Sequence, residues 1–127
     1  KDSFLNNKKI LGICLGMQLM MSDSEESPGC EGLNLIHGSV KLVSSKIVKV
    51  PLLGWYDVKF KDCNFNDNTF FFNNKYMVAP KDKNAILGYV GNYLPAFINK
   101  KNIYSLQFHP EKSSEQGMNI LELILKV

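Results

Sequence analysis

The spacing of apolar residues divides the chain into helical ends and a strand-rich middle. Residues 1–8 are mostly polar and are typical of the end of a helix. Residues 8–13 form an almost continuous apolar run, which predicts a buried strand of the parallel type. Apolar residues at helical spacing then predict a helix over residues 15–21 and a last helix that begins at about Ser113.

The last helix has start signals as well as periodicity. Ser113 is a suitable N-cap, and Glu115 and Gln116 lie in the first turn that follows it. The apolar residues at helical spacing in this segment are Met118, Leu121, Ile124 and Leu125. We therefore expect a helix at the end of the chain.

The middle of the chain is dense in short segments that favour strands. A polar, turn-forming stretch over residues 22–29 separates it from the helix before it. Strand patterns occur at residues 39–43, 46–50, 54–60, 69–72, 76–79, 85–90, 96–98 and 103–108. This density does not fit a simple alternation of strands and helices, so we expect an α/β fold whose middle strands run in mixed directions.

Composition narrows the class of protein without identifying its chemistry. A length of 127 residues suffices for one domain with a real core, so we expect a single domain over residues 1–127. The hydrophobic content of 45% and the charged content of 21% are ordinary for a globular protein. The net charge of +3 comes from scattered lysines without a long basic run, so we expect no nucleic-acid partner.

The cysteines indicate the cellular compartment, and the first residue suggests that the sequence is a fragment. Cys14, Cys30 and Cys63 include no C-x-x-C pair, and their odd number argues against a disulfide framework or a zinc site. No segment approaches the roughly 18 unbroken apolar residues of a membrane span. We expect a cytoplasmic protein with no metal, no cofactor and no membrane partner. The chain opens with Lys1 rather than methionine, so we expect a fragment.

Candidate chemistry begins where the first apolar run stops at Cys14. Glycines stand two residues before and after it, at Gly12 and Gly16, and the predicted helix follows directly. Strand, sharp turn and helix in this order are the layout of a nucleophile elbow. We expect larger side chains at these glycine positions to collide, and the helix start to favour the thiolate. A buried, unreactive cysteine explains the stretch equally well.

A second motif, just after the last predicted strand, offers this thiol a base. His109 follows the apolar segment, Glu111 comes two residues later, and Pro110 fixes the backbone between them. A thiol nucleophile needs a base within hydrogen-bond reach, and the base needs an orienting group. If Cys14 and His109 end neighbouring strands, they meet where open α/β sheets place their chemistry. His-x-Glu alone favours an ordinary loop, but together with the elbow it favours a nucleophile.

The remaining residues of catalytic or aromatic type have no comparable context. His37 is interpreted as a structural or surface residue. Cys30 and Cys63 have no helix start after them and are interpreted as structural thiols. Trp55 is expected in the core or at the rim of the site, and residues 70–72, all phenylalanine, are expected in a buried strand.

With both motifs in view, the chain resembles the class I, or triad, glutamine amidotransferases. The motifs are Gly-Ile-Cys-Leu-Gly-Met-Gln at residues 12–18 and Gln-Phe-His-Pro-Glu at residues 107–111. The similarity extends over essentially the whole chain. It implies a flavodoxin-like α/β fold, a mixed sheet flanked by helices, here without the N-terminal strands of the family. Within the family, the chain resembles the glutaminase subunits of imidazole glycerol phosphate synthase at residues 32–36, 49–51, 54–55 and 107–113.

The resemblance also implies roles for individual residues. Cys14 corresponds to the nucleophile, His109 to the general base and acid, and Glu111 to the carboxylate that orients the histidine. Thiolate attack on the side-chain amide of glutamine would release ammonia and leave a glutamyl thioester, which water hydrolyses. The Leu15 backbone N–H corresponds to an oxyanion donor, and Gln18 to a residue that holds the substrate glutamine.

By the same resemblance, ammonia would pass to a (β/α)8-barrel cyclase subunit. The resulting heterodimer would make imidazole glycerol phosphate in histidine biosynthesis. The chain departs from the family's usual His-Ser-Tyr at residues 74–76 and from its His-Met-Gly-Trp-Asn at residues 52–56. We also expect the upstream glycine loop that completes the oxyanion hole to be absent. Two alternatives stay open: ammonia supply to another acceptor, such as a surface-polysaccharide amino sugar, and an inactive, truncated interaction module.

Overall fold

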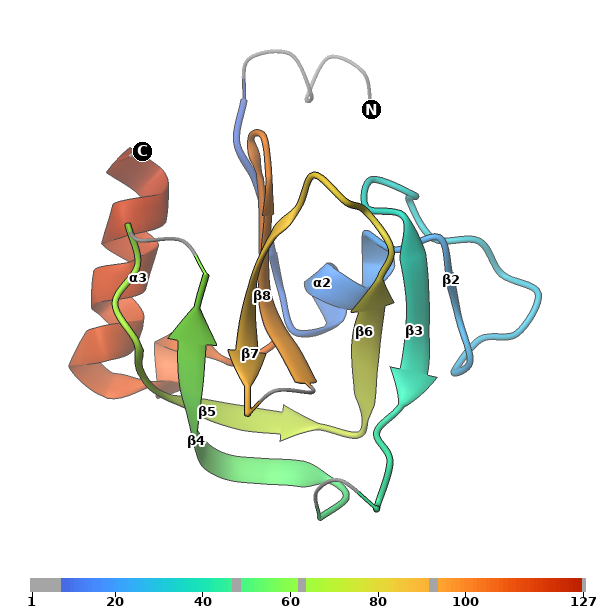
Figure 1. Ribbon diagram of the computed structural model, residues 1–127, viewed down its shortest axis with the longest axis horizontal. Coiled ribbons are helices and arrows are strands. Elements are labelled where there is room, and N and C mark those ends of the chain that lie inside the picture. Colours follow the sequence, from blue (N-terminus) through green and yellow to red (C-terminus); the bar gives the residue numbers. More distant parts are fainter. Residues whose placement is uncertain (1–7, 47–48, 62–63, 92–93, 127) are drawn as a thin grey trace.

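The computed structural model describes residues 8–46, 49–61, 64–91 and 94–126. The helix expected over residues 1–8 lies outside these ranges, apart from Lys8, which is not helical. Within them, a larger and a smaller β-sheet are combined with a short helix after the first strand and a longer one at the end of the chain (Figure 1). The α/β class expected from the spacing of apolar residues is confirmed.

The larger sheet contains six of the described strands and has mixed directions. Their order across the sheet is β1-β9-β8-β7-β4-β5. Their bounds are β1 Ile10–Ile13, β9 Ile103–Leu106, β8 Leu94–Lys100, β7 Ile86–Val90, β4 Leu52–Phe60 and β5 Asn68–Asn74. β1 and β9 are parallel, with Ile13 opposite Leu106, and the other neighbours are antiparallel. The carboxyl ends of β1 and β9 therefore lie at one edge of the sheet.

The smaller sheet contains three described strands in the order β2-β3-β6. They are β2 (Asp23–Ser24), β3 (Gly38–Leu42) and β6 (Tyr76–Pro80). The sequence pattern does not predict β2, which lies in a polar, turn-forming stretch and is a strand only because Asp23 and Ser24 pair with β3.

One expected strand is wrong as far as the structure describes it. Of residues 46–50, residues 47 and 48 lie outside the described part, and Lys46, Lys49 and Val50 are not in a strand. The chain leaves the smaller sheet after Val43, whose N–H donates to the Lys75 carbonyl, and then turns. The described residues Lys46, Lys49 and Val50 therefore do not extend the smaller sheet.

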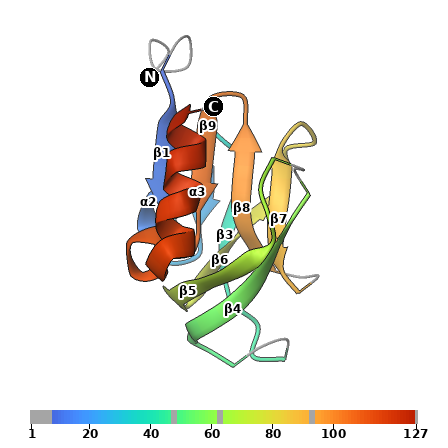
Figure 2. The same cartoon turned by 90° about the vertical axis from the view of Figure 1, so that its left-hand side faces the viewer.

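The larger sheet is covered on both faces, and each face has its own core. α3 (Ser114–Lys126) lies in front of β1 and β9 in the view of Figure 2. Ile120 and Ile124 of this helix share one apolar cluster with residues of the sheet. On the other face, Met17 of α2 (Leu15–Leu19) packs with Ile98 and Val78, in a second cluster that joins the smaller sheet. The sheet flanked by helices is confirmed for these described elements.

Aromatic residues of β5 follow the expected alternation. Phe70 and Phe72 are buried, while Phe71 between them is only partly buried. Phe70 stacks on Phe108 with ring centroids 4.1 Å apart, which ties β5 to the segment after β9. The buried strand expected at residues 70–72 is confirmed.

The last helix has the expected period but a different buried face. Its buried residues are Gly117, Ile120 and Ile124, whereas Met118 and Leu125 are largely exposed. Ser113 directly precedes the helix, yet its hydroxyl accepts from the Phe71 N–H and donates to the His109 carbonyl. Ser113 thus holds the expected N-cap position, and its carbonyl accepts from the Gly117 N–H, but its hydroxyl binds Phe71 and His109 instead of the first turn of the helix.

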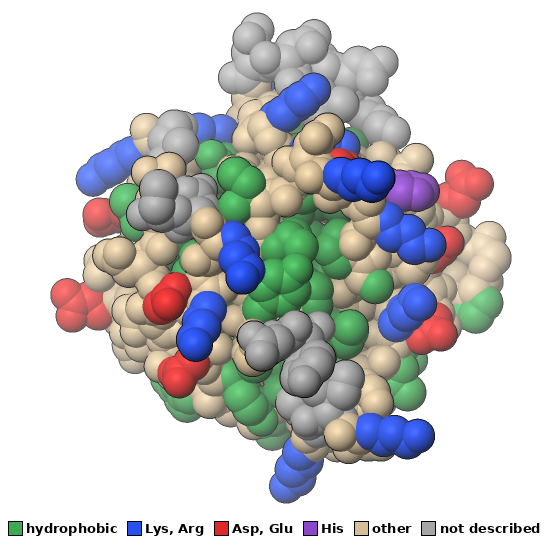
Figure 3. Space-filling model, in the orientation of Figure 1, with side chains coloured by type: hydrophobic (Ala, Val, Ile, Leu, Met, Phe, Trp, Pro, Cys, Tyr) green, Lys and Arg blue, Asp and Glu red, His purple; other side chains and the backbone are tan. Residues whose placement is uncertain are grey.

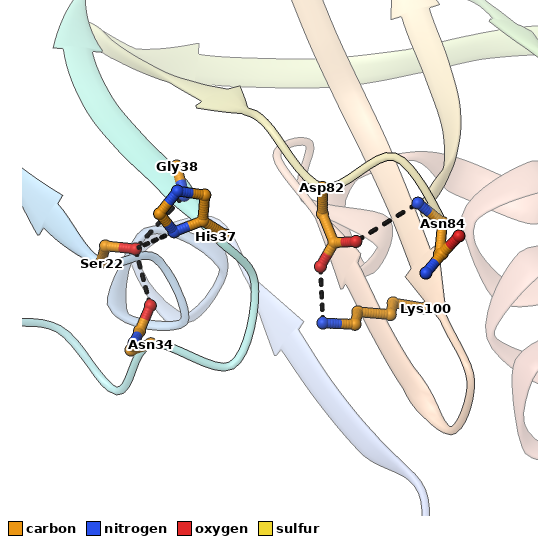
Figure 4. Close-up of polar contacts among 7 residues, drawn as sticks. All are labelled: Ser22, Asn34, His37, Gly38, Asp82, Asn84 and Lys100. Atoms are coloured by element: carbon orange, nitrogen blue, oxygen red, sulfur yellow. Dashed lines mark hydrogen bonds and ion pairs between the residues drawn. The ribbon is translucent and has the colours of Figure 1, made fainter.

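Polar contacts anchor the smaller sheet beside the end of α2. The Ser22 hydroxyl lies 2.6 Å from Asn34 Oδ1 and 3.4 Å from His37 Nδ1, and it accepts from the Gly38 N–H (Figure 4). His37 is exposed, in agreement with its interpretation as a structural or surface residue. These contacts hold the start of β3 against the segment that leaves α2.

An ion pair joins the segment after β6 to the end of β8. Lys100 Nζ lies 2.5 Å from Asp82 Oδ2, and the other carboxylate oxygen accepts from the Asn84 N–H (Figure 4). Hydrogen bonding from Lys100 holds the pKa of Asp82 below its ordinary value. On the face shown in Figure 3, lysine side chains are spread around apolar ones and mixed with acidic side chains. Among the described residues, no helix is long and apolar enough to cross a membrane.

Candidate active site

Cys14 occupies a strained turn between β1 and α2. Its backbone has φ 54° and ψ −105°, and its N–H donates to the Leu106 carbonyl of β9 at 2.7 Å. A positive φ is unfavourable for a residue with a β-carbon and persists only where the surroundings impose it, most often at functional sites. The expected sequence of strand, sharp turn and helix is confirmed, although α2 ends at Leu19 rather than residue 21.

The two flanking glycines are not equivalent. A β-carbon on Gly12 would lie 2.9 Å from the backbone carbonyl of Gly16 and 2.7 Å from Met20 Cε. A β-carbon on Gly16 would meet nothing within 4 Å among the atoms that the structure describes. The collision expected at both glycines is therefore confirmed for Gly12 and wrong for Gly16. Gly12 is needed because the first turn of α2 folds back over β1.

The thiol of Cys14 is partly buried, and its electrostatic surroundings differ from the expectation. Burial raises the pKa of Cys14 above its ordinary value, and the negative charge of Glu111 acts in the same direction. Hydrogen bonding from the Leu15 backbone and from Gln107, together with the charge of Lys112, lowers the pKa without reversing the shift. The expected effect of the helix start is therefore present in the hydrogen bond from the Leu15 backbone, but burial outweighs it, so the net shift of the Cys14 pKa is upward.

His109 follows β9 and is held by several backbone contacts. Its N–H donates to the Phe71 carbonyl at 2.9 Å, and its own carbonyl accepts from the Lys112 N–H and the Ser113 hydroxyl. Pro110 is buried and begins the 3-10 helix η1 (Pro110–Lys112). Nδ1 of His109 lies 3.1 Å from Oε2 of Glu111. The expected pairing of these two side chains on a fixed turn is confirmed.

Cys14 and His109 come to the same edge of the larger sheet. Parallel pairing of β1 with β9 places both residues just beyond the carboxyl ends of neighbouring strands, as expected. In the part of the chain that the structure describes, their side chains make no hydrogen bond to each other. Catalytic hydrogen bonds are often long before substrate binds, so this geometry is compatible with a nucleophile and its base.

The two residues assigned to substrate binding lie beside a shallow hollow. Leu15 is 60% exposed, and Gln18 donates from Nε2 to the Tyr76 carbonyl at 3.3 Å. The hollow has a volume of about 210 Å³, and its lining includes Leu15, Gln18, Asp23, Cys30 and Glu31. Cys30, interpreted as a structural thiol, is exposed on this wall. Cys63 lies outside the described residues.

Residues beyond those singled out in the sequence also approach the site. Gln107 is buried and places Nε2 at 3.8 Å from Cys14 Sγ. Asn74 donates to the same Tyr76 carbonyl as Gln18, so the segment that departs from the family pattern lies next to the hollow. Gln107 could have been noticed as a polar residue in an otherwise apolar segment, but its contact with the sulfur depends on the pairing of β1 with β9.

Trp55 lies at the surface rather than in the core. It is 47% exposed and packs edge-to-face against Phe71, whose carbonyl accepts from His109. Of the two positions expected for Trp55, the core is therefore excluded. Among the described residues, no group of three or more histidine, cysteine or acidic side chains is arranged to hold a metal ion.

The fold and the elbow together are those of a family of glutamine-using enzymes. Residues 1–126 match the model of the glutamine amidotransferase class-I family, and the chain belongs to that family. A crystal structure of a glutamine amidotransferase superposes with a TM-score of 0.72 at 15% identity, covering 94% of this chain and 62% of that one. A glutamine amidotransferase from Thermotoga maritima superposes with a TM-score of 0.64 at 18% identity, covering 98% and 50%.

Two curated relatives in sequence carry the same subunit name. Imidazole glycerol phosphate synthase subunit HisH from Methanocaldococcus jannaschii is 42% identical over 120 residues, which are 88% of this chain and 60% of the relative. The subunit of the same name from Thermotoga maritima is 38% identical over 124 residues, 95% of this chain and 60% of the relative. The chain thus spans about 60% of the length of these relatives.

Proposed function

We propose that this chain carries the catalytic part of a glutaminase with Cys14, His109 and Glu111 as its triad. The observation that supports this most is the strained Cys14 turn, set at the same sheet edge as the 3.1 Å His109–Glu111 pair. A positive φ at a cysteine serves no purpose for a merely buried thiol, whereas it presents a nucleophile at the tip of an elbow.

The reaction needs two steps at one sulfur. Cys14 Sγ attacks the side-chain carbonyl carbon of glutamine, and its proton passes through His109 to the departing nitrogen, which leaves as ammonia. Water then attacks the glutamyl thioester while His109 takes its proton, and glutamate leaves as the thiol is restored. Glu111 orients His109 and stabilises its protonated form. The sum is glutamine plus water giving glutamate plus ammonia.

Two residues of the elbow complete the proposed substrate site. The Leu15 N–H hydrogen-bonds the resting sulfur and would turn to the oxygen that becomes negative when the sulfur attacks. Gln18 lines the same hollow as Leu15, and the hydrogen bond from its Nε2 to the Tyr76 carbonyl orients its side chain there. We propose these two residues as substrate-binding.

The relatives suggest where the ammonia goes. Because the relatives described above are named as subunits of imidazole glycerol phosphate synthase, we propose that a cyclase subunit of that synthase is the partner and ammonia acceptor. These names favour histidine biosynthesis over an amino-sugar acceptor. The proposed partner is a (β/α)8 barrel that forms a heterodimer with this subunit, and the proposed location is the cytoplasm.

The test is glutamine hydrolysis by the full natural chain with the cyclase subunit. Cys14→Ala should lower glutamate release by at least about 1,000-fold, and His109→Asn should cause a comparable loss. Cys30→Ala, which removes an exposed thiol from the hollow beside Leu15 and Gln18, is the matched control and should keep most of the activity. Hydrolysis that survives Cys14→Ala would refute the triad, and an inactive natural chain that still binds the cyclase would favour the interaction module.

A further inference from the structure

Gln107 is a fully buried polar side chain next to the sulfur. Gln107 follows the last residue of β9, and its side chain is only 2% exposed. Its backbone N–H donates to the Ala96 carbonyl of β8. Burying a primary amide costs free energy unless its donors and acceptor find partners. An apolar residue of the same length would fill this position at a lower cost, so the amide calls for an explanation beyond packing.

The contacts of the amide point at Cys14. Nε2 lies 3.8 Å from Cys14 Sγ, and Oε1 is buried with no hydrogen-bond partner among the described residues. A neutral thiol is a weak acceptor, whereas a thiolate is a charged one and binds an N–H donor much more strongly. The contact therefore strengthens in the state that reacts, and it is weak in the resting state.

We propose that Gln107 is a positioning residue that holds the Cys14 sulfur and stabilises it as the thiolate forms. This inference rests on the proposed role of Cys14 as the nucleophile. Gln107 would not touch the substrate. It would act through the sulfur, from the side of β9, while the Leu15 N–H acts from the side of α2.

Other groups near the sulfur make such a donor useful. Burial and the charge of Glu111 raise the pKa of Cys14, and the charge of Lys112 opposes them. α2, which begins directly after Cys14, contains no charged residue between Leu15 and Leu19. Once the Leu15 N–H turns to the substrate oxygen, Gln107 is the uncharged donor that the structure still places at the sulfur.

The test is the pH profile of Cys14 alkylation by iodoacetamide in the full natural chain, with Cys30 and Cys63 replaced by serine. Gln107→Met keeps the length of the side chain and removes its donor. It should move the midpoint of the profile up by about one pH unit, a tenfold loss of thiolate at a given pH. In the complex with the cyclase, kcat for glutamine hydrolysis should fall roughly tenfold with little change in KM.

Ser105→Ala is the matched control for disturbance of the strand. Ser105 is equally buried, lies two residues earlier on β9 and makes no described contact with the sulfur, so this variant should leave both profile and kcat unchanged. An unchanged midpoint in Gln107→Met would overturn the proposal. A lower midpoint would overturn it too, since it would mean that the amide oxygen accepts from the thiol.

A second measurement needs no core substitution, in case Gln107→Met does not fold. The side-chain amide signals of Gln107 in ¹⁵N-labelled chain should titrate with the same midpoint as Cys14 alkylation, and Cys14→Ala should abolish that titration. Amide signals that ignore the titration of Cys14 would refute the contact. A natural chain that hydrolyses no glutamine with its partner refutes the proposed function instead, whatever the amide signals show.

Discussion

At the scale of single residues, the backbone of Cys14 carries the strain of the site. A side chain at φ 54° is tolerated because β1 and β9 hold the turn from both ends, through the Cys14 N–H bond to Leu106 and the close contact of Gly12 with Gly16. Such strain costs about 1–3 kcal/mol and is maintained by the rest of the structure. Alanine at Gly12 tests the close packing of β1 against Gly16, whereas alanine at Gly16 tests only the helix propensity of that position.

Gly12→Ala should lower the free energy of unfolding by about 1–3 kcal/mol, because the new β-carbon overlaps the Gly16 backbone. Gly16→Ala should be neutral or stabilising by up to about 1 kcal/mol, since this position is helical and open. Urea unfolding of the two variants measures both values. Equal destabilisation by the two substitutions would contradict the structure.

The raised pKa of Cys14 predicts slow alkylation at neutral pH. Burial favours the neutral thiol, so the alkylation rate of the chain without partner or substrate should keep rising beyond the midpoint of about 8.5 typical of free cysteine. Serine at Cys30 and Cys63 isolates the signal, and Cys14→Ser should remove it. A midpoint below that of free cysteine would show that the helix start dominates after all.

The same shift has a consequence for stability. A thiol that holds its proton more tightly in the folded chain stabilises the fold fully below the pKa of the unfolded thiol. This contribution is lost as the pH rises through the folded-state pKa. Cys14→Ala should therefore flatten the alkaline part of a plot of unfolding free energy against pH.

At the scale of elements, the turn that carries His109 is tied to β5 rather than to its own helix. Phe71 accepts from the His109 N–H and donates to the Ser113 hydroxyl, which in turn donates to the His109 carbonyl at 2.6 Å. The segment around η1 thus forms hydrogen bonds with the outer edge of β5. The position of His109 depends on a strand 38 residues away in sequence, as counted from Phe71.

Ser113→Ala should therefore destabilise the fold and loosen His109. The variant leaves the Phe71 N–H without its partner, which should cost about 1–3 kcal/mol in a urea unfolding experiment. Ser45→Ala, at an exposed turn, is the control and should change stability by less than about 0.5 kcal/mol. Indistinguishable unfolding of the two variants would argue against the contact.

At the scale of the whole molecule, a side chain next to the first described strand is hydrogen-bonded to the end of the last helix. Lys9 donates from Nζ to the carbonyls of Ile124 and Leu125, at 2.9 and 3.1 Å, at the end of α3. The last carbonyls of a helix lack partners within the helix, and a positive charge near them is favourable. One lysine thus joins the strand that leads to Cys14 with the helix that covers the sheet.

Lys9→Met should lower the free energy of unfolding by about 1 kcal/mol, through the loss of both hydrogen bonds. Lys8→Met is the matched control, since it removes the same charge at an exposed neighbouring position. It should change stability by less than about 0.5 kcal/mol. Thermal unfolding of both variants is measured at low and at high salt. Equal loss of stability in the two variants would show a general charge effect and would contradict a specific role of Lys9.

Local pattern alone determined most elements of this protein and pointed to its candidate catalytic residues. The strands near residues 54–60, 69–72 and 103–108 follow from apolar spacing, and the elbow and the His-Pro-Glu segment from residue types at short range. These features could be predicted because they depend on side-chain periodicity and on the conformational limits of glycine and proline, which act within a few residues.

Tertiary structure alone decided what each of these segments meets. It made Asp23–Ser24 a strand by pairing it with β3, gave the Ser113 hydroxyl to β5 instead of α3, and left residues 49 and 50 outside any strand. It also set the direction of the Cys14 pKa and brought Gln107 to the sulfur. Burial and long-range hydrogen bonds depend on which strands become neighbours, and no local pattern along the chain encodes that choice.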